Sequence, residues 1–143
     1  EAGSAFALVL EPAWRAGLEG LEGFGHVMAL WLADKAEWDD AYLTTPSPYR
    51  GGPEVVGIFA TRSPIRPNRV CASVSRVTGI DMAAGRISLD WIDAMDGTPL
   101  IDLKPYHPSS DRIEKPSMPA WCSSWPRSLE ASADFDWSKV FNF

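Results

Sequence analysis

The chain has 143 residues, of which 45% are hydrophobic and 22% charged, so it can form one folded domain with a buried core. A net charge of −6 at pH 7 argues against binding nucleic acid through the whole surface. We expect no membrane span, signal peptide or metal site, because no apolar run nears roughly 18 residues and the two cysteines lack ligand spacing; the cytoplasm is the expected compartment.

Short strands separated by turns are predicted over most of the chain. The clearest alternation lies at 86–92, where Ile87, Leu89 and Trp91 alternate with serine and aspartate. In chain order, the expected elements are a strand at 5–10, a helix-like segment at 11–18, a strand at 26–32, an exposed excursion at 34–52, and strands at 55–60, 70–77, 86–92 and 99–103. Six such strands favour a mostly β fold, either an antiparallel sheet or a small β-barrel.

The segment after Tyr106 is rich in proline and serine, and it also carries several tryptophans and phenylalanines. This composition predicts an irregular extension that docks on the rest of the molecule. A lone histidine on an apolar strand, such as His26, is more often a satisfied core residue than a catalyst. Four further tryptophans are interpreted as core and interface residues: Trp14, Trp31, Trp38 and Trp91.

The most informative segment follows the expected strand at 55–60. Ser63-Pro64 and Arg66-Pro67 predict a stiff, extended loop, because proline fixes its own φ and restricts the residue before it. Arg62 and Arg66 carry planar cations that suit a carboxylate or phosphate, although a surface ion pair is the plain alternative. Residues 62–76 contain four arginines and no acid, which favours contact with one anionic group or a short strand.

Three blocks of sequence resemble one family in the same order. ATRSPIRPN at 60–68 is similar to the ATRSPHRPN signature of the TsaA-like (TrmO, YaeB-like) proteins. LEGLEGFGHV at 18–27 is similar to that family's LEGFSH block, and DGTPLIDLKPY at 96–106 is similar to its DGTPVLDIKPY block. Characterised members of the family are S-adenosylmethionine-dependent methyltransferases of threonylcarbamoyladenosine in tRNA.

The resemblance implies a small antiparallel β-barrel that dimerises, rather than the Rossmann-like fold of most methyltransferases. No strand–GxGxxG–helix unit is present in the chain, in agreement with this expectation. The barrel domain is expected at 1–106, with one further strand before Glu1 in the family, and the extension is expected at 107–143. The implied cofactor is S-adenosylmethionine, the implied substrate is tRNA, and no metal is implied.

The family's site residues map onto this chain position by position. The resemblance places the methyl donor against Ala33, Asp34, Arg62, Ala72, Asp96, Gly97, Thr98 and Pro99. Contacts with the methyl acceptor are expected from Arg66, Asn68, Arg69, Lys104 and Tyr106. Ala33 and Asp34 replace a Phe-His pair, so their contact must be through the main chain. The residues identify no catalytic base.

Departures from the signature leave the acceptor open. Ile65, Arg69 and Cys71 replace the family's His, Pro and Gly. A methyltransferase acting on tRNA is favoured because the three blocks keep their order. The alternatives are a methyltransferase of the same fold with a small-molecule acceptor and a non-catalytic module that binds S-adenosylmethionine.

Overall fold

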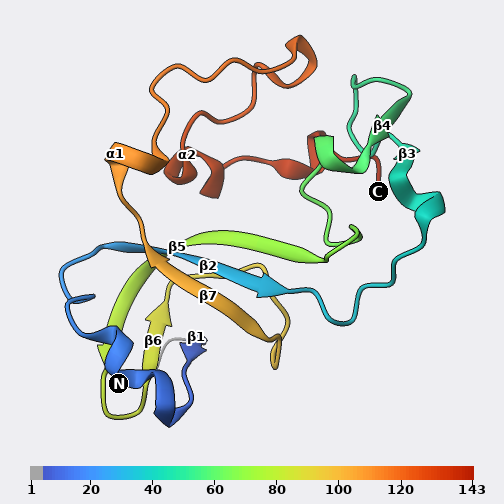
Figure 1. Ribbon diagram of the computed structural model, residues 1–143. Coiled ribbons are helices and arrows are strands. Elements are labelled where there is room, and N and C mark those ends of the chain that lie inside the picture. Colours follow the sequence, from blue (N-terminus) through green and yellow to red (C-terminus); the bar gives the residue numbers. More distant parts are fainter. Residues whose placement is uncertain (1–4) are drawn as a thin grey trace. The chain divides into compact units, whose positions relative to one another are not determined.

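The computed structural model describes residues 5–143 (Figure 1). The chain forms two compact units, and each of them is discontinuous in sequence. The first unit contains the residues up to Glu37 together with Asn68–Arg112, and the second contains Trp38–Pro67 and Ile113–Phe143. This division of the chain differs from the domain boundary expected after Tyr106. That boundary stays a prediction.

The first unit is built on a five-stranded antiparallel sheet with the order β1-β6-β5-β2-β7. A 3₁₀ helix, Pro12–Leu18, connects the first two strands, and the short helix α1, Pro108–Asp111, follows the last strand. The strands are β1 (Phe6–Val9), β2 (His26–Leu32), β5 (Val70–Asp81), β6 (Arg86–Leu89) and β7 (Leu100–Pro105). The mostly β, antiparallel prediction is therefore confirmed.

The expected barrel closure is not found among the strand pairings of residues 5–143. Strand β5 pairs with β2 along its first half and with β6 along its second half, and the register shifts between Val77 and Gly79. This irregularity allows one long strand to pair with two different strands along its length. Strands β1 and β7 stand at the two ends of the order, so the sheet is open.

One face of this sheet carries the core of the first unit. Val27 and Ala29 of β2 and Ile87 and Leu89 of β6 are fully buried. The alternation at 86–92 predicted this for Ile87 and Leu89. The alternation ends at Leu89, because Asp90 accepts the main-chain N–H groups of Arg76 and Trp91 at 3.0 and 2.8 Å. Trp91 and Trp14 are 55% and 68% exposed, so they are not core residues, and their place at an interface stays a prediction.

Two serines on the core face of β5 differ in their bonding and provide a matched stability test. Ser73 Oγ accepts the indole N–H of Trp31 at 3.0 Å, whereas the Oγ of Ser75, a residue only 2% exposed, has no partner among the described residues. Ser75→Ala should raise the free energy of unfolding by about 1 kcal/mol, because an unsatisfied buried hydroxyl is removed. Ser73→Ala should lower it by about 1 kcal/mol, because it leaves the indole unpaired. Urea denaturation of both variants checks the opposite signs.

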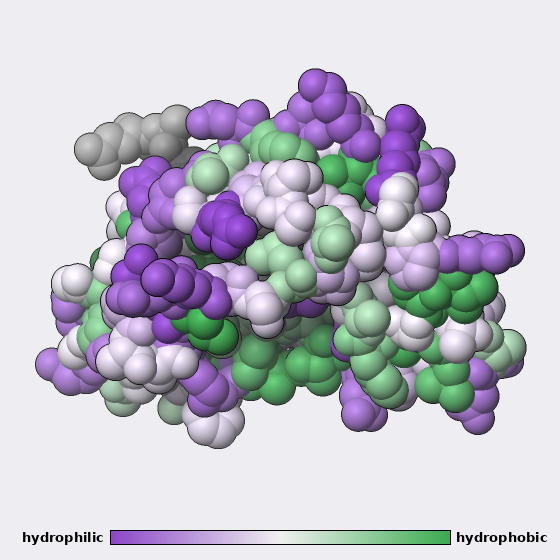
Figure 2. Space-filling view, turned by 90° about the horizontal axis from the view of Figure 1, so that it is seen from above, coloured by the Kyte–Doolittle hydropathy of each residue, from purple (hydrophilic) through white to green (hydrophobic). Residues whose placement is uncertain are grey.

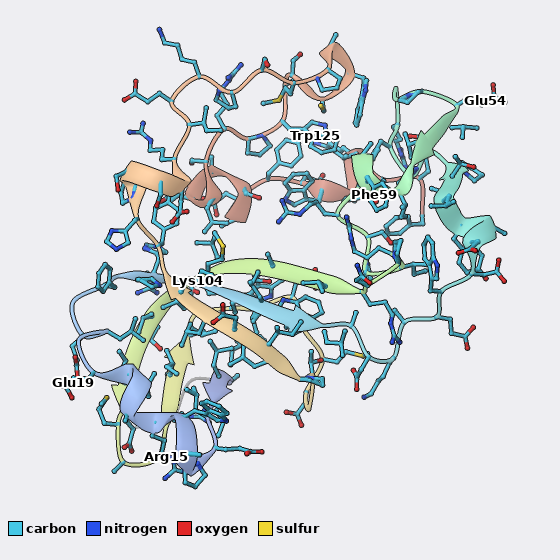
Figure 3. All side chains as sticks on the ribbon, in the orientation of Figure 1. Arg15, Glu19, Glu54, Phe59, Lys104 and Trp125 are labelled. Carbon is cyan, nitrogen blue, oxygen red and sulfur yellow. The ribbon has the colours of Figure 1, made fainter. Side chains whose placement is uncertain are left out.

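The second unit contains a small antiparallel hairpin of β3 (Thr44–Pro46) and β4 (Val55–Gly57). The strand expected at 55–60 is therefore too long, because residues Ile58–Ala60 form a 3₁₀ helix that buries Ile58 and leaves Phe59 exposed. Figure 3 labels Phe59 on this segment. The unit's remaining short elements are 3₁₀ helices Asp40–Leu43, Ala120–Cys122 and Trp137–Lys139, and helix α2, Leu129–Ala133.

Aromatic side chains hold the second unit together. The ring of Tyr49 stacks on Trp121 with centroids 5.1 Å apart and meets Trp125 at 5.4 Å. Arg50 Nε donates to the carbonyl of Phe141 at 2.8 Å, and Asn142 Nδ2 donates to the carbonyl of Ser47 at 3.1 Å. The excursion expected to be exposed thus pairs with the end of the chain. Figure 2 shows that both hydrophilic and hydrophobic residues are exposed on one face of the molecule, and that hydrophobic residues there lie in small groups.

Burial raises the pKa of the Tyr49 phenol, with a smaller contribution from the nearby Cys122 thiol. Because the folded state holds this proton more tightly, the resulting stability is present below pH 10 and is lost as the pH rises through the raised pKa. The free energy of unfolding should therefore fall less steeply above pH 10 in Tyr49→Phe than in the wild type. Urea denaturation at stepped pH measures this; equal slopes would contradict it.

Candidate functional site

The signature loop at 61–68 is stiffened by bonds from side chains to its own main chain. Thr61 is buried, and its Oγ1 donates to the carbonyl of Ile58 at 2.7 Å while accepting the N–H of Ser63 at 3.3 Å. Arg66 Nη1 donates to the carbonyls of Thr61 and Ser63 at 3.2 and 3.1 Å. Arg66 therefore supports the loop from within, and its contact with the acceptor stays a prediction.

Arg62 differs from Arg66 in its surroundings. Its side chain is exposed, and the part of the chain that the structure describes gives it no hydrogen bond and no ion pair. The cation stands on a loop that other residues hold in place, as the sequence predicted for a binding group. Arg62 can thus offer its planar fork to an anion without breaking an internal contact.

The first unit gathers most of the other predicted donor contacts at one end of its sheet, where β2 ends and β5 and β7 begin. The N–H of Leu32 donates to the carbonyl of Pro99 at 3.0 Å, and the N–H of Ala33 donates to the carbonyl of Arg69 at 2.9 Å. Asp34 follows directly, and Ala72 pairs with Leu30 one strand away. Register, rather than sequence distance, brings these residues together.

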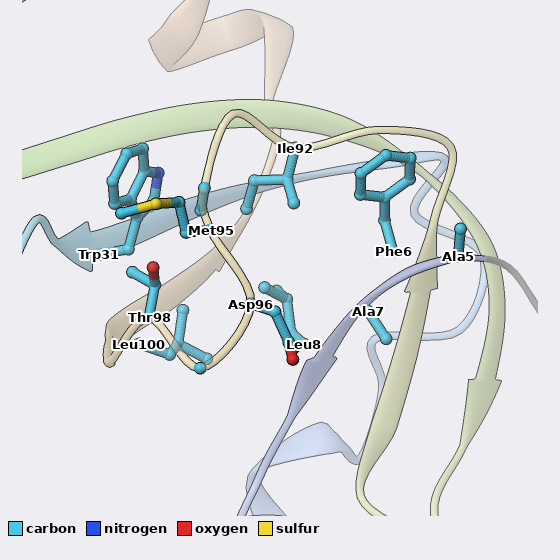
Figure 4. Close-up of a pocket in the computed structure, with 12 residues that line it drawn as sticks. Ala5, Phe6, Ala7, Leu8, Trp31, Ile92, Met95, Asp96, Thr98 and Leu100 are labelled. Carbon is cyan, nitrogen blue, oxygen red and sulfur yellow. The ribbon is translucent and has the colours of Figure 1, made fainter.

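The Asp96-Gly97 turn lies at the same end of the sheet. Thr98 N–H donates to the carbonyl of Met95 at 3.2 Å, and Gly97 adopts a φ of 79°, which glycine accepts without strain. Asp96, Gly97 and Thr98 line a pocket of about 240 Å³ together with apolar side chains (Figure 4). The apolar lining comes from Phe6, Leu8, Trp31, Ile92, Met95 and Leu100.

This pocket combines an apolar wall with a carboxylate, a hydroxyl and the main-chain groups of a turn. Such a lining suits the flat ring of a ligand held at its edge by polar groups. Its volume is below the usual size of a pocket for a whole cofactor, so it can take only part of one. The sequence predicted the Asp-Gly turn as part of the site, but it did not predict that Trp31 and Met95 line the pocket. Two signals were available: Met95 directly precedes the turn, and Trp31 lies on the inward face of β2 with Val27 and Ala29.

Two predicted acceptor contacts, Lys104 and Tyr106, lie at the opposite end of the sheet. Lys104 pairs with Met28, and the N–H of Tyr106 donates to the carbonyl of His26 at 3.0 Å. Strands rise about 3.3 Å per residue, so the length of β2 puts roughly 20 Å between the two ends. Figure 3 labels Lys104 on β7. The other two predicted acceptor contacts in this unit, Asn68 and Arg69, lie at the end of the sheet where β2 ends and β5 begins.

Lys104 is already paired on the strand surface. Its Nζ lies 2.9 Å from Asp102 Oδ2, and this bond, with the Leu103 N–H that the same carboxyl accepts, lowers the pKa of Asp102. His26 at this end is half-buried, and its ring meets Tyr106 edge-on with centroids 6.3 Å apart.

Within residues 5–143, no group of three metal-ligating side chains occurs and no helix is long and apolar enough to cross a membrane.

Most of the chain matches a known protein family. Residues 2–112 match the family described as the tRNA-methyltransferase O N-terminal domain. The chain belongs to this family. The resemblance drawn from the three sequence blocks is thereby confirmed.

Solved and curated members show how far the likeness extends. An S-adenosyl-L-methionine-binding protein of Archaeoglobus fulgidus is 35% identical over 99 residues, which are 69% of this chain and 67% of that protein. A tRNA (adenine(37)-N6)-methyltransferase of Mus musculus is 36% identical over 89 residues, which are 62% of this chain and 20% of that protein. The crystal structure of TrmO from Pseudomonas aeruginosa matches with a TM-score of 0.60 at 36% identity, covering 78% of this chain and 45% of that chain. The chain spans less than half of the length of its Pseudomonas relatives.

Proposed function

We propose that the protein is an S-adenosylmethionine-dependent methyltransferase that acts on tRNA. The observation that carries this proposal is the family match over 2–112, with the turn at 96–99 and the end of β2 joined by a hydrogen bond between Leu32 and Pro99. When bound, S-adenosylmethionine supplies an activated methyl group. The chain's own residues would bind it, orient it and exclude water around it.

The residues present fit parts of this cofactor. The pocket beside Thr98 offers an apolar wall and turn groups for an aromatic ring. Arg62, which has no ion pair within residues 5–143, offers a cation for a carboxylate. Ala33 and Asp34 would contribute main-chain groups, because their side chains are short or exposed. Seven of the eight predicted donor contacts belong to the first unit, and Arg62 belongs to the second.

The proposed acceptor is the N6 nitrogen of threonylcarbamoyladenosine in tRNA. The family description and the name of the mouse relative support a tRNA substrate. That nitrogen belongs to a urea-like group and must lose a proton, so a base or ordered water is required. No residue is assigned to this role.

Donor binding without methyl transfer is the second candidate function. The name of the archaeal relative supports it, and this chain covers a larger share of that protein than of the mouse enzyme. A small-molecule acceptor is a further variant, because Ile65, Arg69 and Cys71 depart from the family's signature. We retain cytoplasmic residence as part of the proposal, supported by the absence of a disulfide between Cys71 and Cys122.

Incubation with labelled donor and total tRNA, followed by nucleoside mass spectrometry, separates these functions. Label in the modified adenosine supports the tRNA enzyme, and label only in a small-molecule extract supports the variant acceptor. Tight donor binding with no transfer supports the binding module. Binding to tRNA should weaken as salt is raised, because phosphate contacts release counterions.

Dimerisation also remains a proposal. Large apolar side chains stay exposed in the second unit, among them Phe59 at 72% and Ile113 at 74%, and a second copy could cover them. Light scattering at micromolar concentration should give twice the mass of one chain. A monomer mass would remove the dimer from the proposal.

A further inference from the structure

Arg69 has an unusual backbone conformation. Among the described residues, it is the non-glycine residue with a positive φ, at 52°. Arginine adopts this left-handed region at a conformational cost, so the surrounding structure must hold it there. The strain sits immediately before β5, at the end of the sheet that carries the predicted donor contacts.

Both the main chain and the side chain of Arg69 bind one short turn. Its carbonyl accepts the N–H of Ala33 at 2.9 Å. Its Nη1 donates to the carbonyl of Asp34 at 3.2 Å and to the carbonyl of Ala36 at 3.1 Å. The left-handed conformation allows this arrangement, because it directs one residue's carbonyl and guanidinium at the same partner segment.

The turn at 33–36 also has main-chain hydrogen bonds of its own. The N–H of Asp34 donates to the carbonyl of Leu32 at 2.8 Å, and the N–H of Ala36 donates to the carbonyl of Ala33 at 3.0 Å. The guanidinium of Arg69 bridges two of the turn's carbonyls from outside it. Arg69 thus adds a charged donor to two carbonyls that the turn's own bonds leave available.

The turn is also linked to the other predicted donor contacts. Leu32, directly before it, donates its N–H to the carbonyl of Pro99 at 3.0 Å. One chain of hydrogen bonds thus connects Arg69, the turn at 33–36 and the Asp96–Pro99 turn. A displacement of Asp34 by about 1 Å would move the main-chain groups that the donor must meet, which is enough to weaken binding strongly.

We propose that Arg69 is a positioning residue, which holds the main chain at 33–36 in the conformation that binds the methyl donor. The inference rests on the proposed function, because it assumes that Ala33 and Asp34 meet the donor. Arg69 acts through these residues and touches neither donor nor acceptor, in contrast to the acceptor contact expected from the sequence. The conformation and the guanidinium are separate contributions, so they can be tested separately.

Three variants test the contribution of the guanidinium apart from that of the conformation. Arg69→Gly accepts the left-handed φ without strain and removes only the guanidinium. Arg69→Lys retains a cation but replaces the planar guanidinium, whose Nη1 donates to both carbonyls, with a flexible ammonium group. Gly20→Ala is the control, because Gly20 also has a positive φ, at 79°, but no neighbouring atom near an added Cβ.

The experiment measures S-adenosylhomocysteine affinity by calorimetry and hydrogen exchange at the Ala36 amide, with urea denaturation alongside. Arg69→Gly should bind at least tenfold more weakly and exchange Ala36 faster, with stability near that of the wild type, and Arg69→Lys should restore part of the affinity. Gly20→Ala should lose stability but keep the wild-type affinity. Unchanged S-adenosylhomocysteine affinity in Arg69→Gly would overturn this inference and leave the proposed function standing. Weaker and less salt-dependent tRNA binding, with unchanged S-adenosylhomocysteine affinity, would overturn it in the same way. A wild type that binds no ligand would overturn the proposed function as well.

Discussion

Replacing Arg62 with alanine should weaken S-adenosylhomocysteine binding about 10-fold to 150-fold, equivalent to about 1.5–3 kcal/mol for a charged hydrogen bond. Arg62 is exposed and bonds to no other described residue, so its removal leaves the loop's own bonds intact. The loss should therefore appear in ligand affinity and not in the stability of the fold. Calorimetric titration of the full chain measures it.

Two further arginines serve as controls for this prediction. Arg127 is also exposed in the second unit and lies outside the signature loop, so Arg127→Ala should bind the ligand like the wild type. Arg66→Ala removes two bonds to loop carbonyls and should weaken both loop order and affinity. Equal affinity in Arg62→Ala and Arg127→Ala would contradict a role for Arg62 at the donor.

Gly85→Ala should lower the free energy of unfolding by about 2–4 kcal/mol, because it combines backbone strain with a steric clash. Gly85 has a φ of 65°, and an added Cβ would lie 2.7 Å from the carbonyl oxygen of Leu10 and 2.7 Å from Arg15 Cγ. Leu10 also donates its N–H to the carbonyl of Gly85 at 2.8 Å, so the main chains cannot simply separate. The hairpin between β5 and β6 would lose its bond to the end of β1.

The steric part of this cost can be isolated. Gly20→Ala carries a similar positive φ but meets no atom within 4 Å, so it should cost only about 1–2 kcal/mol. Urea denaturation of both variants gives the difference, which measures the contact with Leu10 and Arg15. A Gly85→Ala protein no less stable than Gly20→Ala would show that the hairpin relaxes freely.

Sequence patterns placed the five strands of the first unit to within a few residues, because apolar or alternating runs there are bounded by turn residues. The strand at 26–32 is confirmed to the residue, and the Asp96-Gly97 turn is confirmed by the φ of Gly97. The strand predicted at 55–60 is wrong for Ile58–Ala60, because a short apolar stretch does not distinguish a strand from a buried helical turn. Thr44–Pro46 was missed because a three-residue strand ending in proline carries no periodic signal.

The candidate site was only partly accessible from sequence. Family motifs named Ala33, Asp34 and the Asp96–Pro99 turn, and strand register brings these together. The separation of Tyr106 from them depends on pairing along β2, which no local pattern encodes. The roles of Arg66 and Arg69 also depend on tertiary geometry, because a sequence does not show which carbonyls a guanidinium will meet.

Calorimetric titration of the unmodified chain with S-adenosylhomocysteine tests the central claim most directly. We expect saturable binding with micromolar or tighter affinity, reduced by Arg62→Ala and unaffected by Arg127→Ala. No binding at high-micromolar ligand, in a chain shown to be folded by cooperative urea denaturation, would contradict the claim that this protein binds the methyl donor.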